Sequence, residues 1–135
     1  MILLDIPYTP IPWKAPRFSR WGTYDVQADK KSAIKKLILS QYQGEILTCP
    51  VSIEFIFYFT PPKSLSKKKY HVYIQNLTPI LNTTDCTNCQ KLFEDTLQGT
   101  VIKNDRQVQK ISSQKLYSTK AHVVCKIEKL FENQS

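Results

Sequence analysis

Residues 51–59 alternate between apolar and mixed positions along their whole length, and no other segment constrains the fold as strongly. The odd-numbered positions are all large and apolar: Val51, Ile53, Phe55, Phe57 and Phe59. A period of two is the pattern of a β-strand with one face turned to a core. Pro61-Pro62 closes the segment, since proline cannot donate to a strand ladder. The alternation therefore predicts the central strand of a sheet.

Two other segments have the periodicity of amphipathic helices. The first begins near residues 25–29 and runs to about Tyr42, with Gly44 marking its end. Its expected inner face is apolar: Ala33, Ile34, Leu37 and Ile38. The second spans residues 85–98, with Asp85 or a preceding threonine as N-cap and Gly99 beyond its end. Its expected apolar stripe is Cys86, Cys89, Phe93 and Leu97, with Asp85, Asn88, Leu92 and Asp95 near another face.

Three further segments read as strands: residues 2–6, 108–117 and 121–130. Residues 118–120 would join the last two as a hairpin. The chain has 135 residues, which suits one domain, because two would leave neither half enough apolar surface. We therefore expect a single α+β domain, residues 1–135, with a small mixed sheet of about four strands and two helices in the order β-α-β-α-β-β.

Two segments fit neither pattern. Prolines at positions 7, 10, 12 and 16 impose an extended path on residues 7–16. Residues 63–81 begin with lysines among serines and continue with apolar residues that form no clear element. A connection of this length is long for a compact domain, so we expect a mobile, basic insertion loop with a functional role.

The charge balance favours a polyanionic partner. Nineteen Lys and Arg residues stand against eleven Asp and Glu, a net charge of +8. Such an excess favours nucleic acid, because each neutralised phosphate releases counterions; a merely basic protein is the alternative. No apolar run approaches the roughly 20 residues that cross a bilayer, and the start lacks a signal-peptide pattern. These observations predict a cytoplasmic protein with no membrane partner.

The four cysteines allow a rival interpretation. Cys86 and Cys89 form a C-x-x-C pair that could be half of a zinc site or a redox pair. Cys49 and Cys125 stand alone, so a second pair of ligands is missing. The same spacing also places two small apolar residues on one buried helical face, which is the interpretation we favour.

Two aspartates are candidates for metal-dependent chemistry. Asp85 stands at the start of the second helix and Asp105 in the loop after it. A loop that folds back along the helix would bring both carboxylates together, and such hard oxygens hold Mg²⁺. Aspartates at these places also cap helices and turns, so the spacing alone leaves both roles open.

The residues around these aspartates form a longer motif. Residues 85–91 read D-C-T-N-C-Q-K, residues 95–97 read D-T-L and residues 104–108 read N-D-R-Q-V. This run resembles the RusA-type Holliday junction resolvases, whose pattern is D-x-D-N-x-x-K, then D-x-L, then D-D-x-Q-V. Residues 6–10, 15–20 and 57–63 also resemble the phage-type branch, and only residues 63–81 lie outside the resemblance.

The resemblance implies a homodimeric, Mg²⁺-dependent endonuclease that resolves four-way DNA junctions in recombination and repair. Mn²⁺ would be a possible substitute, and no nucleotide cofactor is implied. Asp85 and Asp105 match metal-binding aspartates, Lys91 matches a lysine that faces the scissile phosphate, and Asn88 and Asp95 keep supporting positions. The residues expected to contact DNA are basic: Lys14, Arg17, Arg20, Lys67, Lys68, Lys69 and Arg106.

The chain departs from the family pattern at two positions. Thr87 replaces the second acid of D-x-D, and Asn104 replaces the first acid of D-D. A threonine hydroxyl can bind Mg²⁺ but brings no charge; Asp95 or Glu94 could supply the missing carboxylate. The sequence therefore leaves two functions open, an active nuclease and a weakened or inactive junction-binding protein on the same fold.

Overall fold

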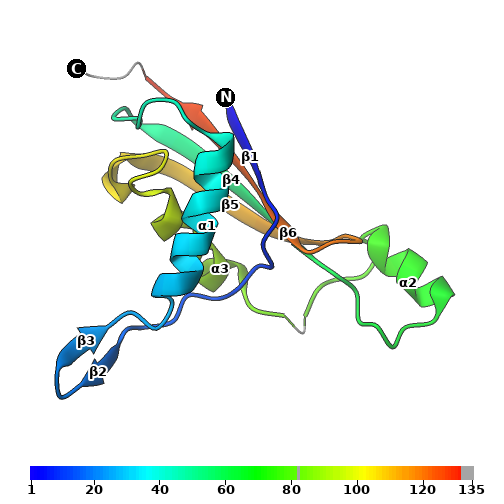
Figure 1. Ribbon diagram of the computed structural model, residues 1–135. Coiled ribbons are helices and arrows are strands. Elements are labelled where there is room, and N and C mark those ends of the chain that lie inside the picture. Colours follow the sequence, from blue (N-terminus) through cyan, green and yellow to red (C-terminus); the bar gives the residue numbers. More distant parts are fainter. Residues whose placement is uncertain (82, 132–135) are drawn as a thin grey trace.

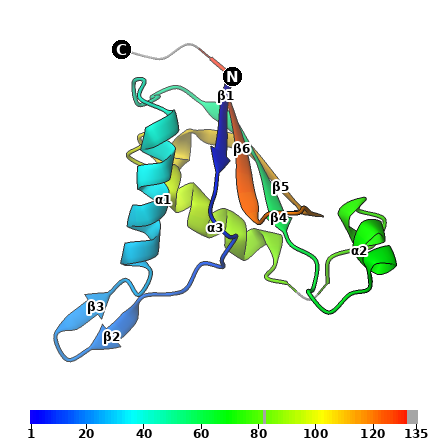
Figure 2. The same ribbon diagram turned by 45° about the vertical axis from the view of Figure 1, so that its right-hand side comes forward.

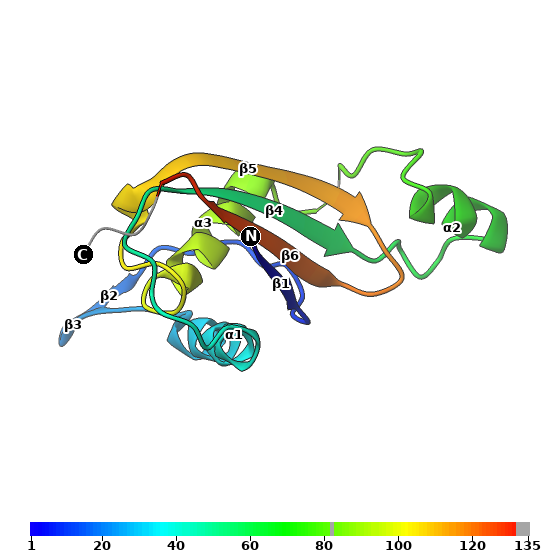
Figure 3. The ribbon, with the colours of Figure 1, turned by 90° about the horizontal axis from the view of Figure 1, so that it is seen from above.

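The computed structural model describes residues 1–81 and 83–131. Four strands form a mixed sheet, and two helices, α1 and α3, cover one of its faces (Figures 1 and 3). In spatial order, the strands are β1 (Ile2–Ile6), β6 (His122–Lys129), β4 (Val51–Phe59) and β5 (Val108–Tyr117). The predicted α+β class and single small domain are confirmed.

Strand β4 is central, as its alternation predicts. It pairs antiparallel with β6 and parallel with β5. All five of its odd-numbered residues are buried, and Phe55 and Phe57 stack with ring centroids 5.5 Å apart. Ile56, which points to the other face, is only 8% exposed. Apolar side chains on both faces are typical of a strand inside a sheet, with a paired strand along each of its edges.

The predicted hairpin of the last two strands is wrong. Strands β5 and β6 do not pair, because β4 lies between them. The connection after Tyr117 passes across the end of β4, where the Ser118 amide donates to the Phe59 carbonyl at 2.8 Å. A short connection favours a hairpin between the two strands that it joins. Here the packing of the most apolar strand, β4, in the middle of the sheet decides the pairing instead.

Both predicted helices are present, as α1 (Ala28–Gln41) and α3 (Cys86–Leu97). Ile34 and Ile38 bury the inner face of α1, whereas Ala33 is exposed and Leu37 only partly buried. On α3 the buried residues are Cys89, Leu92, Phe93, Thr96 and Leu97. Leu92 is therefore a core residue, which corrects its predicted place on another face, and Cys86 is only partly buried.

Two segments project from the body in opposite directions (Figures 1 and 2). One is a small hairpin of β2 (Arg17–Ser19) and β3 (Gly22–Tyr24). The other carries a third helix, α2 (Lys67–Ile74), whose N-cap is Ser66. Residues 67–74, which were predicted to belong to a mobile basic loop, are therefore helical. Helix α2 buries none of its residues, which explains why no apolar periodicity announced it.

Helix α2 is attached to the sheet by Asn76, the second residue beyond its end. Asn76, at a φ of 58°, accepts a hydrogen bond from the Tyr117 amide at 2.6 Å and donates to the Tyr117 carbonyl at 3.3 Å. The rings of Tyr73 and Tyr117 also lie 5.1 Å apart. Within the described ranges, no helix is both long and apolar enough to cross a membrane.

Candidate active site

Asp85 occupies the N-cap position of α3. Its carboxylate accepts a hydrogen bond from the backbone amide of Asn88 at 2.8 Å and another from the Asn88 side chain at 3.2 Å. Such a cap satisfies a helix donor that has no partner within the helix. Asp85 is exposed, so its carboxylate performs a structural task while remaining in contact with solvent.

Asp105 begins a short 3-10 helix, η1 (Asp105–Gln107), beyond the other end of α3. The Asn104 side chain caps this turn by accepting from the Arg106 amide at 2.9 Å, and the Gln107 side-chain oxygen accepts from the Asn104 amide at 2.8 Å. The Gln107 side chain also donates to the carbonyls of Leu47 and Cys49, just before β4. These bonds fix Asp105 at the edge where β4 and β5 begin.

Helix α3 separates the two aspartates. Its 12 residues span about 18 Å at 1.5 Å per residue. Asp85 lies at the start of this length, whereas Asp105 follows its end, and the charge of Asp105 acts on Glu94 in the last turn. Asp85 and Asp105 of one chain therefore flank opposite ends of α3.

Glu94 is the acidic neighbour of Asp105. Its pKa is raised first by desolvation and then by the charges of Asp105 and Asp95. Neighbouring carboxylates whose charges raise the pKa of Glu94 in this way form a region of negative potential that a cation would relieve. From the sequence, Glu94 was only a possible substitute ligand. Its spacing of three residues from Lys91 could have predicted that both side chains lie on the same face of α3.

The outward face of α3 carries the motif residues that do not pack into the core. Thr87, Lys91 and Glu94 follow one another at helical spacings of four and three residues, so they share this face. Thr87 and Lys91 are exposed and Glu94 is partly buried. We call Thr87, Lys91, Glu94 and the adjoining Asp105 the α3 outer face.

Lys91 contacts the N-terminal segment. Its ammonium nitrogen lies 3.5 Å from the centre of the Trp13 ring. The Trp13 amide also donates to the carbonyl of Asn88 at 3.0 Å. The extended segment, residues 7–16, therefore crosses α3 beside the α3 outer face, and we call it the N-terminal strap.

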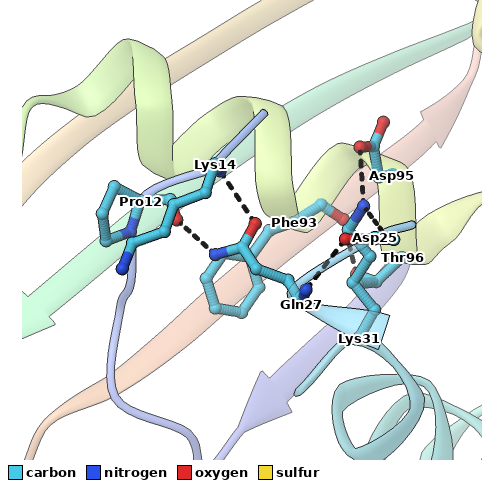
Figure 4. A network of polar contacts seen from close by, with 8 residues as sticks. All are labelled: Pro12, Lys14, Asp25, Gln27, Lys31, Phe93, Asp95 and Thr96. Atoms are coloured by element: carbon cyan, nitrogen blue, oxygen red, sulfur yellow. Dashed lines mark hydrogen bonds and ion pairs between the residues drawn. The ribbon is translucent and has the colours of Figure 1, made fainter. Parts of the chain in front are cut away.

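A buried glutamine holds the strap in place (Figure 4). Gln27 is 2% exposed; its side chain donates to the Pro12 carbonyl at 2.7 Å and accepts from the Lys14 amide at 2.8 Å. A single side chain therefore replaces the ladder bonds that the prolines of the strap cannot make. Nothing in the sequence pattern distinguished Gln27 from a surface residue of the helix.

Asp95, a predicted metal ligand, is engaged in an ion pair. Lys31 lies 2.9 Å from Asp25 and 3.7 Å from Asp95, and it links the end of the β2–β3 hairpin with both helices (Figure 4). The hydrogen bond from Lys31 lowers the pKa of Asp25. The Lys31 side chain is only 19% exposed.

The predicted DNA-contacting residues lie on separate parts of the surface, and all are exposed: Lys14, Arg17, Arg20, Lys67, Lys68, Lys69 and Arg106. Lys14 belongs to the strap and the two arginines at 17 and 20 to the β2–β3 hairpin. The three lysines form the first turn of α2, and Arg106 lies in η1 beside Asp105. The structure thus distributes positive charge over both projections and next to the α3 outer face.

A comparison with protein families identifies the chain. The profile described as "Endodeoxyribonuclease RusA" matches residues 7–128. The chain belongs to the RusA endodeoxyribonuclease family. RusA enzymes resolve Holliday junctions, act on branched DNA and generally depend on a divalent metal. A search of curated proteins gives no match to the chain.

The donor set for that metal differs from the set expected for a RusA protein. Over residues 1–81 and 83–131, no three His, Cys, Asp or Glu residues converge to hold a metal ion. Asp85 and Asp105 flank opposite ends of α3, and Asp95 is paired with Lys31. Glu94 and Asp105 fit a divalent cation in chemistry, because they bring neighbouring carboxylates to a partly open surface. Thr87 on the α3 outer face offers only a hydroxyl.

The C-x-x-C pair, Cys86 and Cys89, lies on α3 with one residue partly buried and the other buried. Cys49, Cys86, Cys89 and Cys125 are all free thiols. Desolvation raises the pKa of Cys89 to about 11, so its thiol stays protonated near neutral pH. Cys89 packs as a core residue, as the interpretation of a buried helical face predicts, whereas Cys86 is only partly buried.

Proposed function

We propose that this chain is a structure-specific endonuclease that resolves Holliday junctions by Mg²⁺-dependent phosphodiester hydrolysis in DNA recombination and repair. The observation that carries the proposal is the α3 outer face, where Lys91 and Glu94 lie beside Asp105 on an exposed surface of a RusA-family chain. The free thiols support a reducing, cytoplasmic location.

Glu94 and Asp105 are the side chains that would hold Mg²⁺, or Mn²⁺ in its place. The ion would polarise the scissile phosphate and lower the pKa of a bound water. Lys91 would bind a phosphate oxygen and stabilise the charge that develops there. Its cation–π contact with Trp13 holds the side chain in position beforehand, so that less conformational entropy is lost when DNA arrives.

Asp85 would contribute to a metal site only in a homodimer. Asp85 caps the start of α3 and Asp105 follows its other end, so we expect one metal ion, with bonds of about 2.1 Å, to be held by only one of the two in each chain. In a two-fold pair with antiparallel α3 helices, Asp85 of one chain would approach Asp105 of the other. Such a pair would also present two sites to the two opposed strands of a four-way junction.

A mixing experiment tests this arrangement. Asp85→Asn and Asp105→Asn are each expected to abolish cleavage of a labelled four-way junction. If sites are shared, about half of all dimers in an equal mixture contain both variants, and each of these has one intact site of two, so about a quarter of the nicking returns, without paired nicks. A mixture as inactive as its components would place each site within one chain.

The proposal as a whole is tested with the wild-type protein. Synthetic four-way junction incubated with Mg²⁺ should be nicked in pairs, whereas linear duplex of the same sequence should not. Asp105→Asn should bind the junction but not cut it, and Asp29→Asn, an exposed residue in the first turn of α1, serves as the matched control. Tight binding with no nick at any Mg²⁺ or Mn²⁺ concentration would defeat the nuclease.

That last outcome would favour a second candidate, a junction-binding protein that does not cleave. The specific observation behind it is that no three metal-binding groups converge among the described residues. Thr87 and Asn104 stand where the family pattern has acids, and Asn104 is used to cap η1. DNA binding would then rest on the exposed basic residues alone and would weaken steeply with salt.

A further inference from the structure

The β2–β3 hairpin exposes aromatic side chains that contribute nothing to the core. Phe18 is 87% exposed, Trp21 is 85% exposed and Tyr24 is 51% exposed. The other tryptophan, Trp13, is partly buried and packs against the core and under Lys91. Aromatic rings at such exposures cost free energy in water, and their clustering on one projecting element is a feature of binding surfaces.

The register of the hairpin arranges these rings with arginines. Arg17 is paired with Tyr24, and Phe18 with Thr23, so the two pairs point to opposite faces of the ribbon. At the tip, the Arg20 guanidinium lies 4.9 Å from the centre of the Trp21 ring. One face of the ribbon thus carries Tyr24 with Arg17, and the other carries Phe18. The tip carries Trp21 with Arg20.

The turn and the base of the hairpin are both held by hydrogen bonds. The Ser19 hydroxyl donates to the Gly22 carbonyl at 3.1 Å and accepts from the Trp21 amide at 3.2 Å. Gly22 adopts a φ of +116°, which side chains rarely allow. At the base, Asp25 is joined to Lys31 of α1. The ribbon therefore presents its rings from a defined position.

We propose that the β2–β3 hairpin binds unpaired nucleotides of DNA, with Trp21 and Phe18 stacking on bases and Arg17 and Arg20 contacting phosphates. An unpaired base offers a free π face to an aromatic ring, whereas bases within a duplex are already stacked. Arginine adds phosphate contact and stacking of its own. The inference rests on the proposed binding of DNA, but it does not depend on cleavage.

The hairpin proposal has a direct binding test. Binding of a single-stranded oligonucleotide and of a blunt duplex of equal length is measured by anisotropy, without divalent metal. We expect Trp21→Ala and Phe18→Ala each to weaken single-strand binding by about 5- to 100-fold, as stacking on one base is worth about 1–3 kcal/mol. Duplex binding should change by less than about twofold. Phe131→Ala, at a residue 65% exposed and outside the hairpin, is the matched control.

Trp21 also supplies an intrinsic signal. In a Trp13→Phe background, the remaining tryptophan fluorescence should be quenched by single-stranded DNA and not by duplex. Far-UV circular dichroism and thermal melting should be unchanged in Trp21→Ala, because the ring buries no core surface. This separates a loss of binding from a loss of folding.

Three outcomes would overturn the proposal. The first is unchanged single-strand affinity in the Phe18→Ala, Trp21→Ala double variant. The second is an equal loss for duplex and single strand in these variants, which would mean that the rings do not select unpaired bases. The third is quenching by anionic lipid vesicles or a change of oligomeric state in place of a DNA effect. A protein that stacks on single strands but never cuts junctions would leave this proposal standing and defeat only the nuclease.

Discussion

The ammonium group of Lys91 lies over the ring of Trp13, with 3.5 Å between the nitrogen and the ring centre. Lys91 comes from α3 and Trp13 from the N-terminal strap, so this contact joins two segments that are far apart in the sequence. It also keeps a cation beside Glu94 on the α3 outer face. The strap therefore helps to position a residue on which the proposed chemistry depends.

Replacing Trp13 should reveal the strength of this link. Trp13→Ala removes a cation–π contact worth about 0.5–2 kcal/mol together with partly buried apolar surface. We expect the free energy of unfolding to fall by about 2 kcal/mol in urea titrations. Trp21→Ala, the matched change at an exposed tryptophan, should lower it by less than about 0.5 kcal/mol. Equal effects of the two changes would contradict the packing described for Trp13.

Replacing Gln27 should destabilise the N-terminal strap more than replacing an ordinary residue at a helix end would. Gln27→Leu leaves the Lys14 amide and the Pro12 carbonyl without their partner, and each lost pairing at a partly buried site costs about 1–3 kcal/mol. We expect the amide of Lys14 to exchange with solvent at least tenfold faster. Hydrogen-exchange NMR measures this directly, and Gln43→Leu, at an exposed position, should leave the exchange rate unchanged.

The raised pKa of Glu94 predicts a specific dependence of the protein's stability on pH. Its pKa in the folded protein is raised above the ordinary value of 4.5 by desolvation and by Asp105 and Asp95. The folded state therefore binds this proton more tightly, a contribution that is present below pH 4.5 and lost as pH rises through the folded pKa. Glu94→Gln should thus raise the melting temperature at pH 7 and have little effect at pH 4. An equal shift at both pH values would contradict the assigned cause, and Glu128→Gln is the exposed control.

The cysteines should differ sharply in reactivity. Burial raises the pKa of Cys89 to about 11 and that of Cys125 further, and Cys49 is also buried. Only Cys86 is partly accessible. At pH 8 a thiol reagent should therefore modify one cysteine rapidly in the native protein and all four after unfolding. Metal analysis should find no zinc; bound zinc with no reactive thiol would revive the C-x-x-C metal site.

Restoring the two acids of the family pattern should strengthen metal-dependent cleavage. At 4 Å and an effective dielectric near 20, one added carboxylate attracts a unit charge by about 4 kcal/mol before solvent compensation. The double change Thr87→Asp, Asn104→Asp should raise nicking at low Mg²⁺ by at least about tenfold, a small part of that attraction. An aspartate at 104 can still cap η1. Thr119→Asp in the exposed β5–β6 connection is the control, and an unchanged rate in the double variant would mean that these positions are not at the site.

Elements with strong periodicity could be predicted from the sequence. Strand β4 and helices α1 and α3 each bury one face, so the spacing of their apolar residues carried the information. Helix α2 buries none of its residues and gave no such signal. The neighbour of β5 was missed because strand pairing depends on tertiary packing, and a short connection is only a local indication.

The candidate site was only partly accessible to sequence reasoning. The motif predicted the residues Asp85, Lys91 and Asp105. The distances among their side chains depend on the course of α3 and of the loop after it, which the motif does not give. The capping role of Asp85 followed from its place before an apolar run. The contact of Lys91 with Trp13 did not, because the strap and the helix meet only through the folded core.

The order of the sheet has a consequence for cutting the chain. A break within the exposed residues 62–64 would separate β1 and β4 from β5 and β6. In the sheet these strands alternate as β1, β6, β4 and β5, so every neighbouring pair would unite one fragment with the other. Neither fragment could build a two-stranded part of this sheet alone. The two pieces should instead fold only together, which makes this protein suited to fragment complementation.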